Sequence, residues 1–538
     1  MTSDMALATH NTLADIVRRS AARFPDKVAV IDGPTQLTFA QFAQRCDGAA
    51  AALQAAGIGR GDVVLMMARN CWQLPLLAFA AAQIGAVFAP VNYLLSSPEV
   101  AQLVELTQPV AVVAEPRFVK TLQQALDRAG LSPADRLVID ATADDIPELW
   151  QDGRRWFDFD GQPQPVAVEP EDVVRLMFTS GTEGLPRAVM HSSRSLMSQY
   201  LSVIVAGQVE STDIDVHVLP LYHCAQLDVL FTPDFMMGAT SVILRSGQPT
   251  EILAAIREHQ ANKFFATPAK WGELLHHRDF DATGLACLTK GYYGASAMPV
   301  AVLEELEERL PQLRLWNFYG QTEMAPAATV LPPENQRSHA GSAGRPILAV
   351  EVAIVPFGST TSAGPGVEGE ICFRSPQCCH GYYGNEAATA ALFRGGWLHS
   401  GDVGYLDDNG YLYFVDRLKD TINVGGEKVS SREVEEIIHQ LPEIAEVAVI
   451  GAPQPRFGEV VVAVVSLQAG ANLAEGDIIQ FVRQQLAAFK VPRRVVVASE
   501  SLPRNASGKL LKRVIKQTYL PQLDGDLLRR RPAPTKAV

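Results

Sequence analysis

The chain has 538 residues, of which 47% are hydrophobic and 20% are charged. This length exceeds that of a single-core domain, so we expect two or more globular domains. The formal net charge is −13, from 46 basic and 59 acidic residues, which argues against a nucleic-acid-binding surface.

Neither a targeting segment nor a disulfide framework is visible, which favours a cytoplasmic protein. The seven cysteines form no CxxC pair and no zinc-type spacing, as expected for packed thiols. The segment Leu74–Val91 is strongly apolar, but Pro75, Gly85 and Pro90 interrupt it. We therefore predict a buried helix of about ten residues and then a strand at Ala86–Ala89, with no integral membrane segment.

Along the chain, short β-rich runs alternate with apolar helical patterns, which indicates a layered α/β architecture. The runs in the first half are Val63–Met67, Val110–Val113, Leu137–Ile139, Ser241–Leu244 and Lys263–Ala266. From about residue 350 the pattern changes to short strands and turns, which predicts a β-rich subdomain. Its expected strands are Val350–Val355, Glu370–Phe373 and Tyr411–Val415.

A break near Asp416–Asp420 precedes a compact unit with its own pattern. Its expected elements are helix Ser431–Gln440, strands Glu446–Gly451 and Val460–Leu467, helix Ala474–Ala488 and strand Arg494–Val497. We predict a large domain at 1–417, a small α+β domain at 418–528 and a flexible tail at 529–538.

The segment Met177–Arg187 (Met-Phe-Thr-Ser-Gly-Thr-Glu-Gly-Leu-Pro-Arg) is the most informative stretch of the chain. It follows an apolar run, as expected for a strand that ends in a flexible loop. Glycine lets backbone N–H groups face an anion, the hydroxyls of the loop add donors, and Arg187 adds a fixed charge. The pattern suits a polyphosphate-binding loop, although a Gly/Ser/Thr surface turn has the same composition.

Three further clusters carry chemistry: Trp316–Glu323, Gly396–Asp402 with Asp416–Asp420 after it, and Leu502–Leu510. In the first, Thr322 offers a hydroxyl to a phosphate and Glu323 a hard oxygen ligand to Mg²⁺. In the second, Asp402 suits two ribose hydroxyls. In the third, Lys509 is a loop cation. Alone, each cluster is more often a turn, a helix cap or a solvated charge than a site.

Together with Pro220–His223 and Tyr293–Ser296, these blocks follow the order and spacing of the adenylate-forming, or acyl-activating, superfamily. The chain resembles its bacterial fatty acyl-CoA synthetases from end to end. The resemblance implies a ligase that uses ATP, Mg²⁺ and coenzyme A on a small-molecule carboxylic acid. The acid would form an acyl-adenylate with release of pyrophosphate, and the CoA thiol would then expel AMP.

The resemblance also implies a role for each matching residue. Phosphate binding falls to Thr179, Ser180, Gly181, Thr182, Arg187 and Thr322, and adenine binding to Gly294, Ala295, Ser296 and Tyr319. Glu323 would ligate Mg²⁺, Asp402 and Arg417 would hold the ribose, and Lys509 would reach the forming acyl–phosphate bond. The small domain would rotate about Lys419 so that Gly425 and Gly426 border the pantetheine channel, with His223 and Gly320 at the acid.

The chain departs from the usual phosphate loop, Thr-Thr-Gly-x-Pro-Lys-Gly, at Glu183, Arg187 and Ala188. Arginine keeps the charge but is not equivalent to lysine, so we expect altered ATP affinity without loss of the chemistry. Ser431 replaces a usual proline and is expected to cap a helix. The segment Gly364–Gly369 matches GxGxxG, but a strand-like run follows it, which predicts a turn.

Small and apolar residues follow Glu323 closely and no basic residue does, which favours an apolar acid over a dicarboxylate. A medium- or long-chain fatty acid fits the resemblance best, and aryl and steroid side-chain acids stay open. A carrier-protein thiol as acceptor and a luciferase-type oxidase are the other classes that share the first step. A homodimer is also left open.

Overall fold

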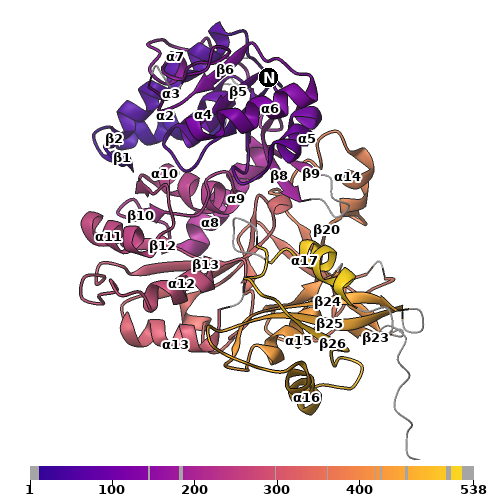
Figure 1. Cartoon of the computed structure of the whole chain (residues 1–538). Coiled ribbons are helices and arrows are strands. Elements are labelled where there is room, and N and C mark those ends of the chain that lie inside the picture. The colour runs from indigo at the N-terminus through magenta and orange to yellow at the C-terminus, as the bar shows by residue number, and fades with distance from the viewer. Residues whose placement is uncertain are drawn as a thin grey trace, which may run out of the picture. The chain divides into compact units, whose positions relative to one another are not determined.

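The computed structural model describes residues 11–142, 146–180, 186–296, 298–359, 361–418, 420–424, 427–454, 458–504 and 510–523, apart from the side chains of residues 180, 427, 428 and 458. The chain divides into two compact units (Figure 1). Unit 1 comprises Met1–Val352 and Cys372–His399, and unit 2 comprises Ala353–Ile371 and Ser400–Val538. The predicted α/β class, with a large N-terminal and a small C-terminal domain, is confirmed.

Among the described residues of unit 1, seven strands form a sheet in the order β7-β6-β5-β3-β4-β8-β9. Its neighbours run parallel except β8 and β9, which form an antiparallel hairpin. The strands are β3 (Val63–Met67), β4 (Val87–Pro90), β5 (Ala111–Ala114), β6 (Asp135–Val138), β7 (Gln151–Asp152), β8 (Val173–Ser180) and β9 (Pro186–Ser192). The accompanying helices are α2 (Leu13–Arg23), α3 (Phe39–Ala55), α4 (Gln73–Gln83), α5 (Ser97–Thr107), η1 (Pro116–Phe118), α6 (Val119–Ala129) and α7 (Arg154–Phe157).

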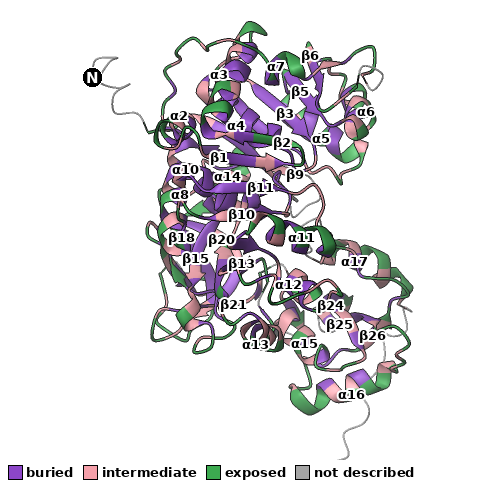
Figure 2. Ribbon diagram, turned by 90° about the vertical axis from the view of Figure 1, so that its left-hand side faces the viewer, coloured by how far each residue is buried: buried purple, intermediate pink, exposed green. Residues whose placement is uncertain are grey.

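Strand β3 shows why the strands of this sheet appear in the sequence as uninterrupted apolar runs. Val64 and Met66 pack in one core with α3 and α4, whereas Leu65 and Met67 pack in another with α5 and α6. Both faces of the strand are therefore buried, as is usual for parallel sheets between helices (Figure 2). The predicted strand at Val63–Met67 is confirmed.

The apolar segment after residue 70 forms the predicted buried helix and strand. Helix α4 is buried along Gln73–Ala82, and strand β4 follows it. Across the described part of the chain, we find no helix with the length and apolar character needed to cross a bilayer.

A second sheet of unit 1 contains nine of the described strands, in the order β16-β15-β14-β13-β12-β10-β11-β1-β2. The neighbouring strands β14, β13, β12, β10, β11 and β1 run parallel to one another. Strand β2 pairs antiparallel with β1, β15 with β14, and β16 with β15. The strands are β1 (Val28–Asp32), β2 (Thr35–Thr38), β10 (Ile214–His217), β11 (Thr240–Ile243), β12 (Lys263–Phe265), β13 (Lys290–Gly294), β14 (Arg314–Gly320), β15 (Ala327–Leu331) and β16 (Arg345–Pro346). The helical elements are α8 (Ser193–Gly207), α9 (Cys224–Gln226), the π-helical turn η3 (Leu227–Phe231), α10 (Thr232–Met237), α11 (Pro249–His259), α12 (Pro268–Leu275), α13 (Val300–Arg309), η4 (Thr322–Met324) and η5 (Pro333–Asn335).

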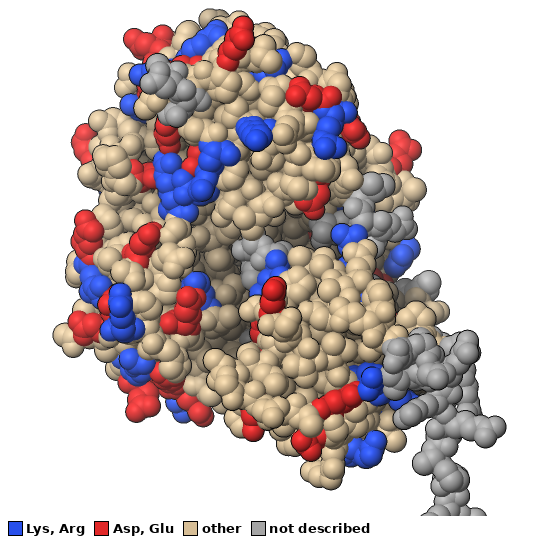
Figure 3. All heavy atoms as spheres, in the orientation of Figure 1, with Lys and Arg blue, Asp and Glu red and all other residues tan. Residues whose placement is uncertain are grey.

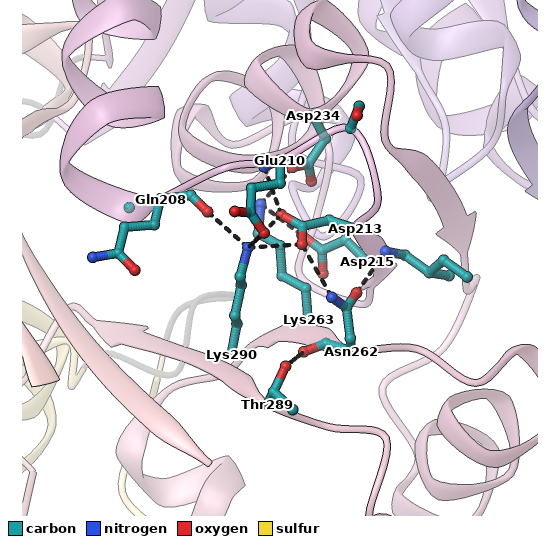
Figure 4. A network of polar contacts seen from close by, with 12 residues as sticks. Gln208, Glu210, Asp213, Asp215, Asp234, Asn262, Lys263, Thr289 and Lys290 are labelled. Carbon is teal, nitrogen blue, oxygen red and sulfur yellow. Dashed lines mark hydrogen bonds and ion pairs between the residues drawn. The ribbon is translucent and has the colours of Figure 1, made fainter. Parts of the chain in front are cut away.

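Two buried lysines hold the middle of this second sheet (Figure 4). Lys290 Nζ donates to Gln208 O at 2.7 Å and to Asp213 Oδ1 at 2.8 Å. Lys263 is wholly buried and forms an ion pair with Asp234. Burial alone would lower the pKa of Lys263, but the nearby carboxylates, Asp234 first, raise it above its usual value. Both ion pairs thus fix strands β12 and β13, which lead to the candidate site.

Unit 2 contains a sheet with strands buried on both faces. The order is β23-β22-β25-β24, with β26 beside β25. Alternate residues of β25 pack in two different cores, one with α15 and α16 and one with α17. The predicted helices and strands of this region are confirmed, with ends shifted by a few residues. The elements are β22 (Ile422–Val424), β23 (Glu427–Val429), α15 (Ser431–Ile438), β24 (Ile444–Gln454), β25 (Gly458–Leu467), α16 (Glu475–Gln485), β26 (Arg494–Val497), α17 (Lys512–Tyr519) and η6 (Leu520–Gln522).

The predicted β-rich region is a further sheet, in the order β17-β18-β20-β19 with β21 beside β20. Its elements are β17 (Glu351–Val355), β18 (Gly369–Arg374), α14 (Glu386–Leu392), β19 (Phe393–Arg394), β20 (Trp397–Leu406) and β21 (Leu412–Arg417). The segment Gly364–Gly369 leads into strand β18 and not into a helix, so the expectation of a turn is confirmed.

The surface charge is mixed on the face drawn in Figure 3, where Lys and Arg lie among Asp and Glu. Among the described residues, basic side chains do not form a broad area on that face, in agreement with the net charge of −13.

Candidate active site

Strands β8 and β9, which pair as an antiparallel hairpin, flank the predicted phosphate loop in the sequence. Thr179 pairs with Arg187 across the two strands, and Ser180 and Pro186 are the last paired residues before the loop. Gly181, Thr182 and Glu183 lie outside the described residues, as does the side chain of Ser180.

A buried ion pair anchors strand β8 below the loop. Arg175 is paired with Asp228 of the π-helical turn η3, and both side chains are 1% exposed. The Tyr200 hydroxyl of α8 donates to Asp228 Oδ1 at 2.7 Å. The contact therefore ties the phosphate-loop strand to the turn that follows the His223 segment. The sequence analysis missed this trio, although an arginine within the apolar run Val173–Met177 signals a buried charge that needs a partner.

Thr322 and Glu323 lie on the 3₁₀ turn η4, directly after strand β14. The turn is tight: Ala325 has a φ of 58°, and a Cβ at Gly320 would lie 1.9 Å from Pro326 O. Gly320 is therefore required by the close approach of two backbone segments. Both predicted side chains are half-buried at the carboxyl end of β14.

Tyr382 joins the two predicted blocks, and the sequence analysis did not include it. Its hydroxyl donates to Glu323 Oε1 at 2.8 Å. Arg187 Cζ lies 4.9 Å from the centroid of its ring, within the range of a cation–π contact. Burial and the Glu323 carboxylate raise the pKa of Tyr382, so its hydroxyl stays a donor. The loop cation and the expected metal ligand are thus linked through one aromatic side chain.

The block around His223 meets the same turn. Cys224 Sγ lies 3.5 Å from Thr322 Oγ1, and burial raises the pKa of the Cys224 thiol to about 12. His223 Nδ1 accepts from Ala225 N at 3.1 Å and caps α9. Burial lowers the pKa of His223 to about 4. Both side chains are therefore neutral near pH 7.

The predicted adenine-binding residues lie at the carboxyl ends of two neighbouring parallel strands. Gly294 ends β13 opposite Phe318 of β14, and a Cβ at Gly294 would lie 2.5 Å from Phe318 O. Ala295 has a φ of 66°, which turns the chain out of the sheet before Ser296. Tyr319 lies one residue beyond Phe318, with its ring 6.5 Å from that of Phe373. Ligands bind at such strand ends in α/β sheets.

His191 of β9 is a further buried group that the sequence analysis missed. It is wholly buried, and burial lowers its pKa to about 3, with repulsion from Arg175 acting in the same direction. The strand that leaves the phosphate loop thus carries a neutral histidine.

In unit 2, the predicted ribose pair is formed by neighbouring strands. Asp402 of β20 pairs in register with Arg417 of β21, and Arg417 Nε lies 3.4 Å from Asp402 Oδ1. Asp402 is buried, and its backbone N–H is held by Ser400 Oγ at 2.9 Å. The predicted ribose pair thus lies side by side on neighbouring strands.

Helix α15 is capped differently from our expectation. Ser430 is the N-cap, since its side chain accepts from Glu433 N, and Ser431 is the first helical residue. The Ser431 N–H and hydroxyl instead donate to Asp416 Oδ2, at 2.6 and 2.8 Å. The expectation was wrong because the cap position is set by Asp416, a partner that lies 15 residues earlier.

Lys509 lies outside the described residues, but the two ends of its loop do not. Arg504 and Leu510 form a β-bridge, and Leu511 N donates to Pro503 O at 2.8 Å. Glu446 Oε2 accepts a hydrogen bond from Leu502 N at 2.7 Å. The loop is thus anchored on strand β24. Lys419, Gly425 and Gly426 also lie outside the described residues.

Glu323 fits Mg²⁺ by its donor chemistry. Its carboxylate is half-buried, held at one oxygen by Tyr382, and hard oxygen donors are what Mg²⁺ takes. The ion usually binds through one or two carboxylates together with substrate phosphates. A single oriented carboxylate beside a phosphate loop meets that requirement.

Comparison with known proteins shows the family of the chain. The AMP-binding enzyme family matches residues 17–383, and the AMP-binding enzyme C-terminal domain matches residues 433–509. A feruloyl-CoA synthase from Amycolatopsis sp. is 32% identical over 503 residues, covering 93% of this chain and 98% of the relative. A long-chain-fatty-acid–CoA ligase from Bacillus subtilis is 30% identical over 534 residues, covering 94% of each chain.

Among solved structures, ATP-bound MatB from Rhodopseudomonas palustris has a TM-score of 0.85 at 25% identity, covering 94% of this chain and 99% of that chain. The family match extends over more than half of the chain and includes the hairpin of Arg187, the turn of Glu323 and the segment of Tyr382. The chain therefore belongs to the AMP-binding enzyme family.

Proposed function

We propose that this protein is an AMP-forming acyl-CoA ligase that activates an apolar carboxylic acid, with medium- and long-chain fatty acids as the first class. Its acid–thiol ligase activity follows from the family and from curated relatives that are CoA ligases. The observation that carries the proposal is the set of contacts from Arg187 through Tyr382 to Glu323. These contacts link the hairpin predicted to bind phosphate to the turn predicted to bind Mg²⁺.

In the first half-reaction, a carboxylate oxygen of the acid attacks the α-phosphorus of ATP. The bond to the β-phosphate breaks, and pyrophosphate leaves with the electron pair. No general base is required, because a carboxylic acid is already ionised near pH 7. Thr322 donates to the α-phosphate and Arg187 neutralises the departing phosphates, so catalysis rests on positioning and charge. Mg²⁺ bound at Glu323 would supply further neutralisation of the phosphate charge.

In the second half-reaction, the CoA sulfur attacks the acyl carbon and AMP leaves. We propose that the small domain, beginning near residue 418, turns about Lys419 between the two steps. Lys509 would serve adenylation, and Gly425 and Gly426 would then border the pantetheine path. The two ends of the Lys509 segment are anchored within the small domain, since Arg504 forms a β-bridge with Leu510, so we expect Lys509 to move with that domain.

The acid is inferred from the residues that follow the metal-binding turn. Met324, Ala325, Ala327 and Ala328 are all buried and apolar. Neutral His223 directly precedes Cys224, which contacts Thr322. Such surroundings favour an uncharged acyl group. The relative that acts on long-chain fatty acids supports the same class.

An aryl acid is the second candidate. It is favoured by the feruloyl-CoA synthase, a relative at 32% identity. The two classes are separated by measuring AMP formation with a panel of acids at equal concentration, with octanoate, palmitate, ferulate and malonate as probes. The proposal expects kcat/KM to be highest for an aliphatic acid and lowest for malonate. Highest kcat/KM for ferulate would replace the fatty acid by an aryl acid, and highest kcat/KM for malonate would contradict the apolar site.

A further inference from the structure

A short segment, Cys379–Tyr383, connects the metal-binding turn to the strand that leaves the phosphate loop. We call it the Tyr382 strap. Cys379 N donates to Glu323 O at 2.9 Å, and Tyr383 N donates to Ala188 O at 2.8 Å. Its middle is paired with Met190 of β9, which donates to Gly381 O at 3.0 Å. The strap therefore holds the backbones of two functional blocks at a fixed separation.

The strap itself has little freedom. Gly381 has a φ of 109°, and a Cβ there would lie 2.3 Å from Thr389 Cγ2. The Tyr382 N–H donates to Thr389 Oγ1 at 2.9 Å. Glycine is therefore required at position 381, and helix α14 fixes the direction in which the Tyr382 side chain leaves the strap.

The side chain of Tyr382 continues the connection that the backbone begins. It is 6% exposed, and its hydroxyl donates to Glu323 Oε1 at 2.8 Å. Arg187 Cζ lies 4.9 Å from the centroid of its ring. Apolar packing alone would not require the hydroxyl to meet a carboxylate that is half-buried at the site.

We propose that Tyr382 is a positioning residue that aims the Glu323 carboxylate at the metal–nucleotide complex and couples it to Arg187 of the phosphate loop. The inference rests on the proposed function, since it assumes Mg²⁺ at Glu323. By holding one oxygen, Tyr382 fixes the rotation of the carboxylate and directs its other oxygen. Partners that orient a metal ligand in this way typically change metal affinity by about 10- to 100-fold when they are removed.

The same contact gives the arginine of this loop a physical role. The Arg187 guanidinium lies over the Tyr382 ring, a contact that arginine makes more often than lysine. Tyr382 therefore holds the Arg187 side chain near the start of β9, directly after the predicted phosphate loop. The departure from the family pattern and the Tyr382 contact are two parts of one arrangement.

The test uses the full-length protein with ATP and no acid, and titrates Mg²⁺ while nucleotide binding is followed by calorimetry. Tyr382→Phe removes the hydroxyl only. We expect its half-saturating Mg²⁺ concentration to rise about tenfold or more, with ATP affinity in EDTA unchanged. The matched control is Tyr383→Phe, because Tyr383 packs against the apolar cluster under β8 and β9 and should leave the Mg²⁺ dependence unchanged.

A second measurement separates positioning from folding. In a Glu323→Gln background, Tyr382→Phe should no longer shift the Mg²⁺ dependence, because the residue acts through that carboxylate. Equal shifts in both backgrounds, equal shifts for Tyr382→Phe and Tyr383→Phe, or an equal loss of ATP affinity in EDTA would each overturn the proposal. The titration needs no acid, so failure to find an acid substrate would count against the proposed function alone.

Discussion

Removal of the Asp228 carboxylate is expected to destabilise unit 1 strongly. Arg175 and Asp228 are each 1% exposed, and the Asp228 carboxylate also accepts the Tyr200 hydroxyl. Asp228→Asn leaves a buried guanidinium without a counter-charge, which costs about 3–5 kcal/mol. Tyr200→Phe removes one hydrogen bond to a charged acceptor and should cost less, about 1.5–3 kcal/mol.

The free energy of unfolding can be followed for unit 1 by tryptophan fluorescence, because all six tryptophans lie in it. Urea titrations give the free energy by linear extrapolation. The control is Asp152→Asn, because its partner Arg154 is 68% exposed and the urea midpoint should stay unchanged. The double variant Arg175→Met/Asp228→Leu removes both charges and should recover most of the loss. A cost below about 1 kcal/mol for Asp228→Asn would refute the reasoning, since a buried pair cannot be broken that cheaply.

Three further predictions concern pH, the turn and the loop lysine. His191 stays neutral in the folded protein, with a pKa of about 3, but is protonated in the unfolded chain below about pH 6.5. The stability that neutral His191 contributes is therefore complete above pH 6.5 and is lost as the pH falls from about 6.5 toward 3. Urea titrations between pH 7 and 4.5 give the free energy of unfolding as a function of pH. In His191→Gln, this free energy should fall less steeply with decreasing pH than in the unsubstituted protein, by about 1.4 kcal/mol per pH unit below the unfolded-state pKa. An unchanged pH dependence would contradict this. Gly320→Ala, whose Cβ would lie 1.9 Å from Pro326 O, should lower kcat/KM for AMP formation about 100-fold, whereas Gly364→Ala, with open space around it, should not; equal effects would refute the turn argument. Lys509→Ala should abolish adenylation in single-turnover assays and largely spare thioester formation from supplied acyl-adenylate, and equal loss in both steps would argue against a rotating small domain.

Much of the fold was predictable, because strands buried on both faces show in the sequence as apolar runs. Val63–Met67 is the clearest case, since all five residues are apolar and form strand β3. The two turns that carry site residues were also predictable, because glycines and hydroxyls follow the runs directly. Gly320 and Gly294 owe their identity to close backbone contacts, which a strand followed by a turn implies in general terms.

The groups that the sequence analysis missed depend on contacts between distant residues. Tyr382 meets Glu323 across 59 positions of the chain, and no local pattern distinguishes it from the neighbouring Tyr383. The predicted cap of α15 was wrong for the same reason, because Asp416 of strand β21 accepts the hydrogen bond of Ser431 N. Arg175 and Lys263 were visible as charges within apolar runs, which signals a buried ion pair but does not name the partner.

The central claim is that the protein makes an acyl-adenylate before it uses the thiol. The most direct measurement is exchange of labelled pyrophosphate into ATP in the absence of CoA, with the best acid of the panel. The account predicts acid-dependent exchange without CoA, and release of one AMP per thioester once CoA is added. Exchange that requires CoA, or formation of ADP and inorganic phosphate in place of AMP and pyrophosphate, would contradict it.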